Sequence, residues 1–133
     1  MTIHSAQDFI LNGYRTPEHP VESLFVNRWS PRAFDGSAMP EKDLLSVLEA
    51  ARWAPSAYNI QPWRFVYSLR GDETWTVFSS FLNDFNRSWA DKASALVLLL
   101  SDTKMPEDFG GKPSNFHRFD SGAAWAQLAL QAS

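Results

Sequence analysis

The sequence contains no cysteine, which excludes disulfide scaffolds, thiolate metal ligands and a cysteine nucleophile. Glycine occurs only 6 times in 133 residues, and never with the spacing of a glycine-rich phosphate-binding loop. The three histidines, at positions 4, 19 and 117, lack metal-ligand spacing, so we expect no metal site. Any bound phosphate must therefore be held by side chains.

Long apolar runs and an excess of positive charge are also missing. The longest purely apolar run, residues 95–100, is far shorter than the roughly 20 residues that cross a bilayer. The first 11 residues lack the apolar stretch of a signal peptide. A formal net charge of −3 argues against a nucleic-acid binder. With 44% hydrophobic residues, the chain is expected to be a single soluble domain over residues 1–133, located in the cytoplasm.

Hydrophobic periodicity predicts the main regular elements. A helix is expected over residues 41–54, where apolar residues recur at helical spacing between Pro40 and Pro55. Residues 63–69 alternate like a strand, and the apolar run over 93–100 predicts a strand buried on both faces. Shorter helices are expected over residues 21–27 and 73–85.

The C-terminal segment is rich in small residues. Asp120 and Ser121 could cap a helix over residues 122–130. Its small side chains would let another helix approach closely, in the core or at a subunit interface; a good helix former without a special partner is the alternative. The helical pattern runs to Ser133 without a capping residue, so we expect the C-terminal portion of the domain to be missing. Residues 104–116, with their prolines and glycines, predict a mobile loop or lid.

A first polar constellation lies in the pentapeptide 28–32. Pro31 disfavours a helical conformation at Ser30, so the segment should be extended. Arg28, Ser30 and Arg32 then point to the same side, where two guanidinium groups and a hydroxyl suit an anionic ligand. Taken alone, the pentapeptide favours the alternative, two surface arginines beside a turn.

A second constellation follows the helix expected over residues 41–54. Two prolines fix the backbone of a loop over residues 55–63 that displays Ser56, Tyr58, Asn59 and Gln61. Loops held by a rigid scaffold often carry function, and the amides could bind the edge of a heteroaromatic ring. An ordinary helix-to-strand turn is the alternative.

Together, these segments resemble the FMN-dependent nitroreductase family. The resemblance lies in the order and spacing of residues 28–34, 48–56 and 59–65, and it extends from Asn27 to the end of the chain. The sequence Pro-Trp-Arg-Phe at 62–65, which opens the expected strand, is the most distinctive part.

The resemblance implies a fold and an activity. The fold is an α+β three-layer sandwich, a mainly antiparallel sheet flanked by helices, in an intertwined homodimer with FMN at the subunit interface. The activity is a ping-pong reaction in which NAD(P)H gives a hydride to FMN and a small-molecule acceptor, such as a nitroaromatic or a quinone, takes the electrons. The flavin carries the chemistry, so no catalytic residue is expected. A non-catalytic flavin-binding or structural remnant of the fold is the alternative.

The resemblance also implies which residues bind the cofactor. These are Arg28, Trp29, Ser30, Arg32, Ser56, Asn59, Gln61 and Asn86. Arg28 and Ser30 would face the phosphate and ribityl chain, and Arg32 the pyrimidine edge of the flavin. The residues from the loop over 55–63 would come from the other subunit. Asn86 matches an asparagine of the family that contacts the flavin, whereas Trp29 stands where relatives often carry arginine or histidine.

Overall fold

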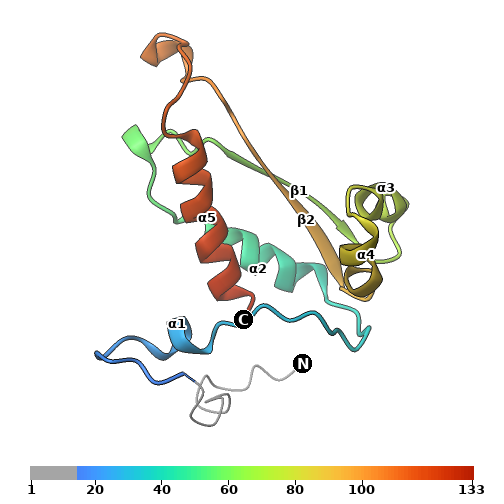
Figure 1. Cartoon of the computed structure of the whole chain (residues 1–133). Helices are drawn as coiled ribbons and strands as arrows, with labels where there is room; N and C mark the ends of the chain where they lie inside the picture. Colours follow the sequence, from blue (N-terminus) through green and yellow to red (C-terminus); the bar gives the residue numbers. More distant parts are fainter. Residues whose placement is uncertain (1–14) are drawn as a thin grey trace.

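A two-stranded antiparallel sheet with helices around it forms the part of the chain that the computed structural model describes, residues 15–133 (Figure 1). The elements are α1 (Ser23–Asn27), α2 (Glu41–Arg52), β1 (Trp63–Leu69), α3 (Trp75–Ser80), α4 (Asp84–Ala90), β2 (Ala95–Ser101) and α5 (His117–Gln131), with short 3-10 turns at Ala57–Asn59 and Glu107–Phe109. The expectation about the first 11 residues, and His4, lie outside the described residues. No helix in the described range is long and apolar enough to span a membrane.

The two strands pair along their whole length, with Trp63 opposite Ser101 and Leu69 opposite Ala95. Both predicted strands are therefore confirmed. Directly opposite residues share a face, so Phe65 and Leu99 pack together toward the helical core. The other face remains partly open. The expectation that the strand over 93–100 is buried on both faces is wrong, because β2 is only half-buried along most of its length.

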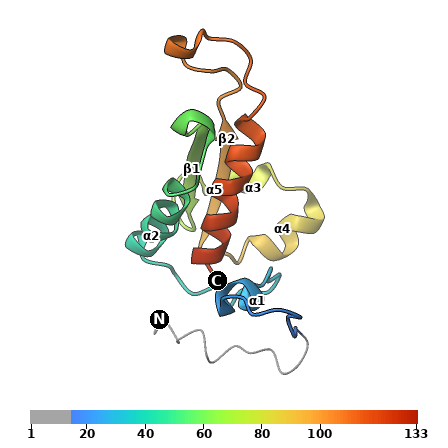
Figure 2. The same ribbon diagram turned by 90° about the vertical axis from the view of Figure 1, so that its left-hand side faces the viewer.

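The core forms where α2 and α5 cross beside the sheet (Figures 1 and 2). Ala51 of α2 and Ala124 of α5 are both fully buried, and they join Ala54 and Trp63 in one cluster. Alanine side chains let the two helix backbones approach closely. Of the two alternatives for the C-terminal segment, the structure therefore selects the closely packed helix.

The helix predicted over residues 41–54 is confirmed as α2, whereas the one predicted over 73–85 is wrong in extent. That stretch holds α3 and the start of α4, separated by a break before Asn83. Asn83 adopts an extended backbone, and its side-chain oxygen accepts a hydrogen bond from Asn86 N–H at 2.8 Å. An asparagine in this role begins a new helix, which explains the break.

The last helix begins earlier than predicted. α5 starts at His117, and Ser114 rather than Asp120 or Ser121 satisfies amides at its start: its hydroxyl accepts from Phe116 N–H and His117 N–H at 3.2 and 3.1 Å. Asp120 and Ser121 lie inside the first turns and are buried. Their expected capping role is therefore wrong.

Residues 104–116 form an arm that projects beyond the start of α5 (Figures 1 and 2). The arm has its own hydrogen bonds: Lys104 bridges to Pro113, and Met105 N–H donates to Lys112 O at 2.8 Å. Its tip is the 3-10 turn Glu107–Phe109, which ends at Gly110 in the left-handed region. The loop expected here is thus folded back on itself.

Candidate functional site

The first group of predicted site residues follows α1. Arg28 Nη1 donates to Ser30 Oγ and to Trp29 O, both at 3.1 Å, so Arg28 and Ser30 lie on the same side of the chain. The ring of Trp29 lies under the guanidinium of Arg15, 5.0 Å from its central carbon. Arg15 also donates to the carbonyls of Val26 and Arg28, at 3.1 and 2.6 Å. Arg15 therefore pins this segment, although no sequence motif marked it.

Arg32 is held against α4. Its guanidinium lies 5.8 Å from the ring centroid of Phe85, and Phe34 stacks on Trp89 with centroids 6.2 Å apart. Phe85 and Trp89 are four residues apart and share one face of the helix. Asn86 follows Phe85 directly, so the structure brings Arg32 and the helix that carries Asn86 together.

The chain beyond Arg32 is anchored to the end of the sheet by Arg70. Its guanidinium donates to the carbonyls of Gly36, Ser37 and Lys92, the last two at 3.0 and 2.8 Å. Within this anchored turn, Ser37 N–H donates to Asp35 at 2.8 Å, and this hydrogen bond lowers the pKa of the Asp35 carboxyl. The segment that carries Arg32 is therefore fixed at both ends.

The second group lies in the turn between α2 and β1. Tyr58, Asn59 and Gln61 have φ angles of 54°, 56° and 51°, a left-handed conformation that residues other than glycine rarely adopt. Ser56 Oγ accepts from Gln61 N–H at 3.0 Å, which closes the turn. Strained backbone of this kind clusters at functional sites.

Two neighbours hold this turn from outside. The Asp120 carboxylate accepts a hydrogen bond from Ala57 N–H at 3.1 Å, and the ring of Phe109, at the tip of the arm over 104–116, lies 5.5 Å from the ring of Tyr58. Sequence reasoning singled out neither contact, because each partner is more than 45 residues away along the chain.

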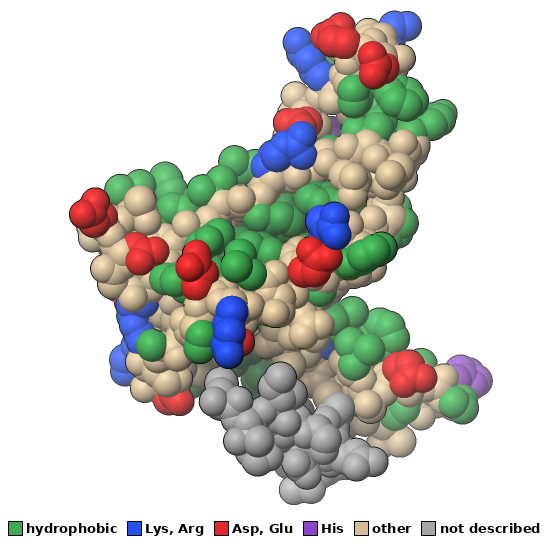
Figure 3. All heavy atoms as spheres, turned by 180° about the vertical axis from the view of Figure 1, so that it is seen from behind, with side chains coloured by type: hydrophobic (Ala, Val, Ile, Leu, Met, Phe, Trp, Pro, Cys, Tyr) green, Lys and Arg blue, Asp and Glu red, His purple; other side chains and the backbone are tan. Residues whose placement is uncertain are grey.

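The two groups do not meet within one chain. The turn of residues 56–61 lies by the first turn of α5, whereas residues 28–32 lie near the other end of that helix (Figures 1 and 2). A helix of 15 residues is about 22 Å long. Figure 3 shows a recess between the α1 region and the main body, with hydrophobic side chains at its margin.

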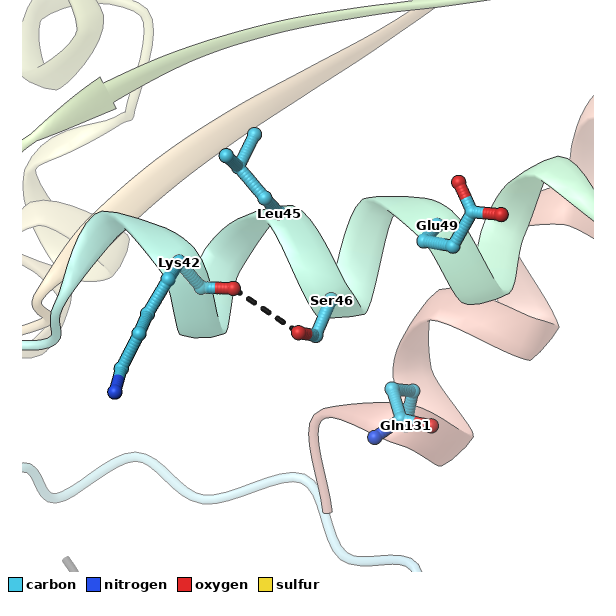
Figure 4. A pocket seen from close by; sticks show the side chains of 5 residues that line it. All are labelled: Lys42, Leu45, Ser46, Glu49 and Gln131. Atoms are coloured by element: carbon cyan, nitrogen blue, oxygen red, sulfur yellow. Dashed lines mark hydrogen bonds between the residues drawn. The ribbon is translucent and has the colours of Figure 1, made fainter.

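Two hollows lie elsewhere on the described residues. One of about 460 Å³ lies between α2 and the end of α5 and is lined by Lys42, Leu45, Ser46, Glu49 and Gln131 (Figure 4). Another of about 430 Å³ lies between α3 and α4. Neither is lined by a predicted site residue. Within residues 15–133, no three acidic or histidine side chains are grouped so that they could hold a metal ion.

Several polar groups of the site are free to bind a ligand. Within residues 15–133, the guanidinium of Arg32 and the side-chain amides of Asn59 and Gln61 make no hydrogen bond, and Arg28 uses only one of its nitrogens. The guanidinium groups suit a phosphate or another anion, and the amides suit the polar edge of a heteroaromatic ring.

The sequence profile of the nitroreductase family matches residues 26–103, which is more than half of the chain. The chain therefore belongs to the nitroreductase family, and the resemblance seen in its sequence is confirmed. The match begins just before Arg28 and ends just after β2, so it includes both groups of predicted site residues.

Known relatives extend this finding. A CLA biosynthesis enone reductase of Lactiplantibacillus plantarum is 37% identical over 82 residues, which cover 61% of this chain and 37% of that protein. An oxygen-insensitive NADPH nitroreductase of Helicobacter acinonychis is 33% identical over 81 residues, covering 60% and 38%. The chain thus spans less than half the length of these two relatives.

Solved structures agree on the fold. A crystal structure described as an oxidoreductase containing FMN matches with a TM-score of 0.84 and 52% identity, over 89% of this chain and 60% of that one. The enone reductase CLA-ER matches with a TM-score of 0.69 and 24% identity, over 82% and 68%. The chain therefore has the nitroreductase-like α+β fold, as expected.

Proposed function

We propose that this chain acts in an FMN-dependent oxidoreductase that accepts a hydride from NAD(P)H and reduces a small molecule such as a nitroaromatic or a quinone. Family membership supports the reaction class, and the similar crystal structure described as containing FMN supports the cofactor. The observation that carries the proposal is that, among residues 15–133, the guanidinium of Arg32 and the side-chain amides of Asn59 and Gln61 make no hydrogen bond, while Arg28 uses only one of its nitrogens. When bound, FMN supplies the hydride chemistry.

The first group would hold the charged end of the cofactor. Arg28 is oriented by its bonds to Ser30 Oγ and Trp29 O, and its remaining N–H groups can bind a phosphate in a charge-assisted manner. Ser30 would bind the same end of the cofactor, and Trp29 would border it under Arg15. Arg32, set over Phe85, would place a positive charge near the pyrimidine edge of the flavin, where it stabilises negative charge.

The second group would hold the ring edge. Ser56 uses its hydroxyl to close the turn, and this fixes the backbone from which the side chains of Asn59 and Gln61 project. Their amides would bind the polar edge of the ring system, and Asn86 would approach it from α4. No acid or base is assigned, because these groups bind and orient the reactants.

We further propose that the site is shared in a homodimer. The two groups lie toward opposite ends of α5, so a symmetric pair of chains would be needed to bring one group from each chain together. Large hydrophobic side chains exposed on the described surface favour such a partner. They include Phe25 at 57%, Phe119 at 82% and Trp125 at 56% exposure. Use of NAD(P)H favours the cytoplasm as the location.

The proposal is tested on the full chain by adding FMN to the purified protein. We expect quenched flavin fluorescence, bleaching of the visible flavin band by NADH or NADPH, and recovery of the band on adding a quinone. A protein that takes up no FMN would contradict the proposal. Binding without bleaching would assign the non-catalytic alternative instead, which the partial coverage of the relatives makes worth testing.

A further inference from the structure

The segment between α2 and β1 is attached to α5 at three points. Ala54 and Trp63, which flank it, are both buried in the cluster that contains Ala124 of α5. Between them, Asp120 of α5 accepts a hydrogen bond from Ala57 N–H at 3.1 Å, across 63 residues of sequence. One face of α5 therefore holds this segment through packing and a hydrogen bond.

The Asp120 side chain is unusual for its burial. Only 5% of the residue is exposed, whereas aspartates are almost never fully buried unless they are paired. Its position in the first turn of α5 lets the helix dipole stabilise the negative charge, and Ala57 N–H is the hydrogen-bond donor found for it among the described residues. A hydrophobic residue would be the simpler choice for packing alone.

The turn that Asp120 contacts is strained, with three left-handed residues that are not glycine. Such conformations persist only where their surroundings over-determine them. The other hydrogen bonds of the turn are local: Ser56 O and Ala57 O accept from Asn59 N–H and Ile60 N–H at 3.0 and 3.1 Å, and Arg64 donates to Gln61 O at 3.0 Å. The bond to Asp120 thus ties this locally closed turn to the core.

From these contacts we infer that Asp120 is a positioning residue, which sets the backbone of residues 56–61 so that Asn59 and Gln61 face the cofactor. The role of the turn in holding a cofactor rests on the proposed function, whereas the contact between Asp120 and Ala57 N–H does not. Asp120 itself touches no reactant and acts through Ala57 N–H.

Two substitutions at Asp120 separate its acceptor oxygen from its charge. Asp120→Ala removes the acceptor, and we expect the FMN dissociation constant to rise about tenfold, because the binding of FMN must then also order the turn that this hydrogen bond no longer holds. Asp120→Asn keeps an acceptor oxygen of the same reach, and the dissociation constant should stay within about threefold of the original protein. Amide hydrogen exchange at Ala57 should accelerate in the alanine variant and much less in the asparagine variant.

A third substitution removes the same bond from the other side. Ala57→Pro deletes the donated N–H at the first position of a 3-10 turn, after a residue whose φ and ψ of −145° and 154° suit a following proline. It should weaken FMN binding as much as Asp120→Ala does. Because both substitutions remove the same hydrogen bond, the variant that carries both should bind FMN no more weakly than the single variant with the lower affinity. This route keeps the test open if Asp120→Ala does not fold.

A matched control is Asp72→Ala. The Asp72 carboxylate also accepts from a backbone amide, Leu69 N–H at 2.9 Å, in the turn after β1 and outside both groups of site residues. Loss of this bond should lower stability without changing FMN affinity. Unchanged FMN affinity in Asp120→Ala, or no rescue by asparagine, would overturn the inference. If the original protein binds no FMN, the proposed function fails, whereas exchange at Ala57 still reports whether Asp120 holds the turn.

Discussion

Arg28 gives the clearest single-residue test of the proposed cofactor site, because its guanidinium is charged and is already oriented by Ser30 and Trp29. Changing Arg28 to Ala should weaken FMN binding by about 1.5–3 kcal/mol, because a charge-assisted hydrogen bond to phosphate is lost. Fluorescence titration of the full chain measures this. The control is Arg118→Ala, since Arg118 is exposed and makes no hydrogen bond or ion pair among the described residues. Equal dissociation constants for the two variants would show that Arg28 is only a surface residue.

Tyr67 gives the protein a pH dependence at the alkaline end. Its hydroxyl donates to Glu41 Oε1 at 2.7 Å, and this hydrogen bond raises the pKa of Tyr67 above its usual 10.0. The unfolded chain loses this proton first, so the stabilisation is complete below pH 10.0 and is lost as the pH rises through the folded-state pKa. Tyr67→Phe should show a flatter decline of unfolding free energy above that pH, measured by denaturant titration. Parallel curves for the two proteins would contradict this.

Individual residues also show which contacts could be predicted from the sequence alone. The alternation of an extended segment was enough to place Arg28 and Ser30 on one side, and the hydrogen bond between them agrees. Arg15 and Asp120 could not be found in that way, because their partners are distant along the chain and neither belongs to a local pattern. Their importance arises only from tertiary packing.

Among the elements, the crossing of α2 and α5 depends on small side chains. Ala124→Val adds volume at a fully buried position and should lower the unfolding free energy by about 1–3 kcal/mol. Ala126→Val is the matched control, because Ala126 is exposed on the same helix and should lose only about 0.5 kcal/mol through helix propensity. Thermal or urea unfolding measures both. Similar losses in the two variants would mean that the helices do not pack tightly there.

The elements were predictable where local pattern and tertiary packing agree. α2 has a regular apolar face and prolines at both ends, and β1 alternates, so both were predicted closely. The break before Asn83 was missed because the pattern of apolar residues continues across it. The hydrogen bond by which Asn83 caps α4 has a stronger effect on the backbone than this pattern. The start of α5 was misplaced because Asp120 resembles a cap in sequence but is used for a long-range contact.

At the scale of the whole molecule, one chain leaves much apolar surface exposed. Val66 and Leu100, on the second face of the sheet, are 45% and 53% exposed, and the residues of α1 are not buried. The sequence predicted an apolar β2 but could not show that one face of the sheet stays partly open, because hydrophobicity does not report which other elements pack against a strand. The same limit applies to the proposed cofactor site: both polar constellations were visible in the sequence, but only the family resemblance assigned them to one cofactor.

The separation of residues 28–32 from residues 56–61 along α5 has a genetic consequence. If each site takes one half from each chain, a copy defective in Arg28 and a copy defective in Asn59 can complement each other. Unfolding and refolding the two variants as a mixture should regenerate tight FMN binding at one site of every mixed pair. A mixture of Arg28→Ala with Ser30→Ala should regenerate none, because both defects then lie in the same half.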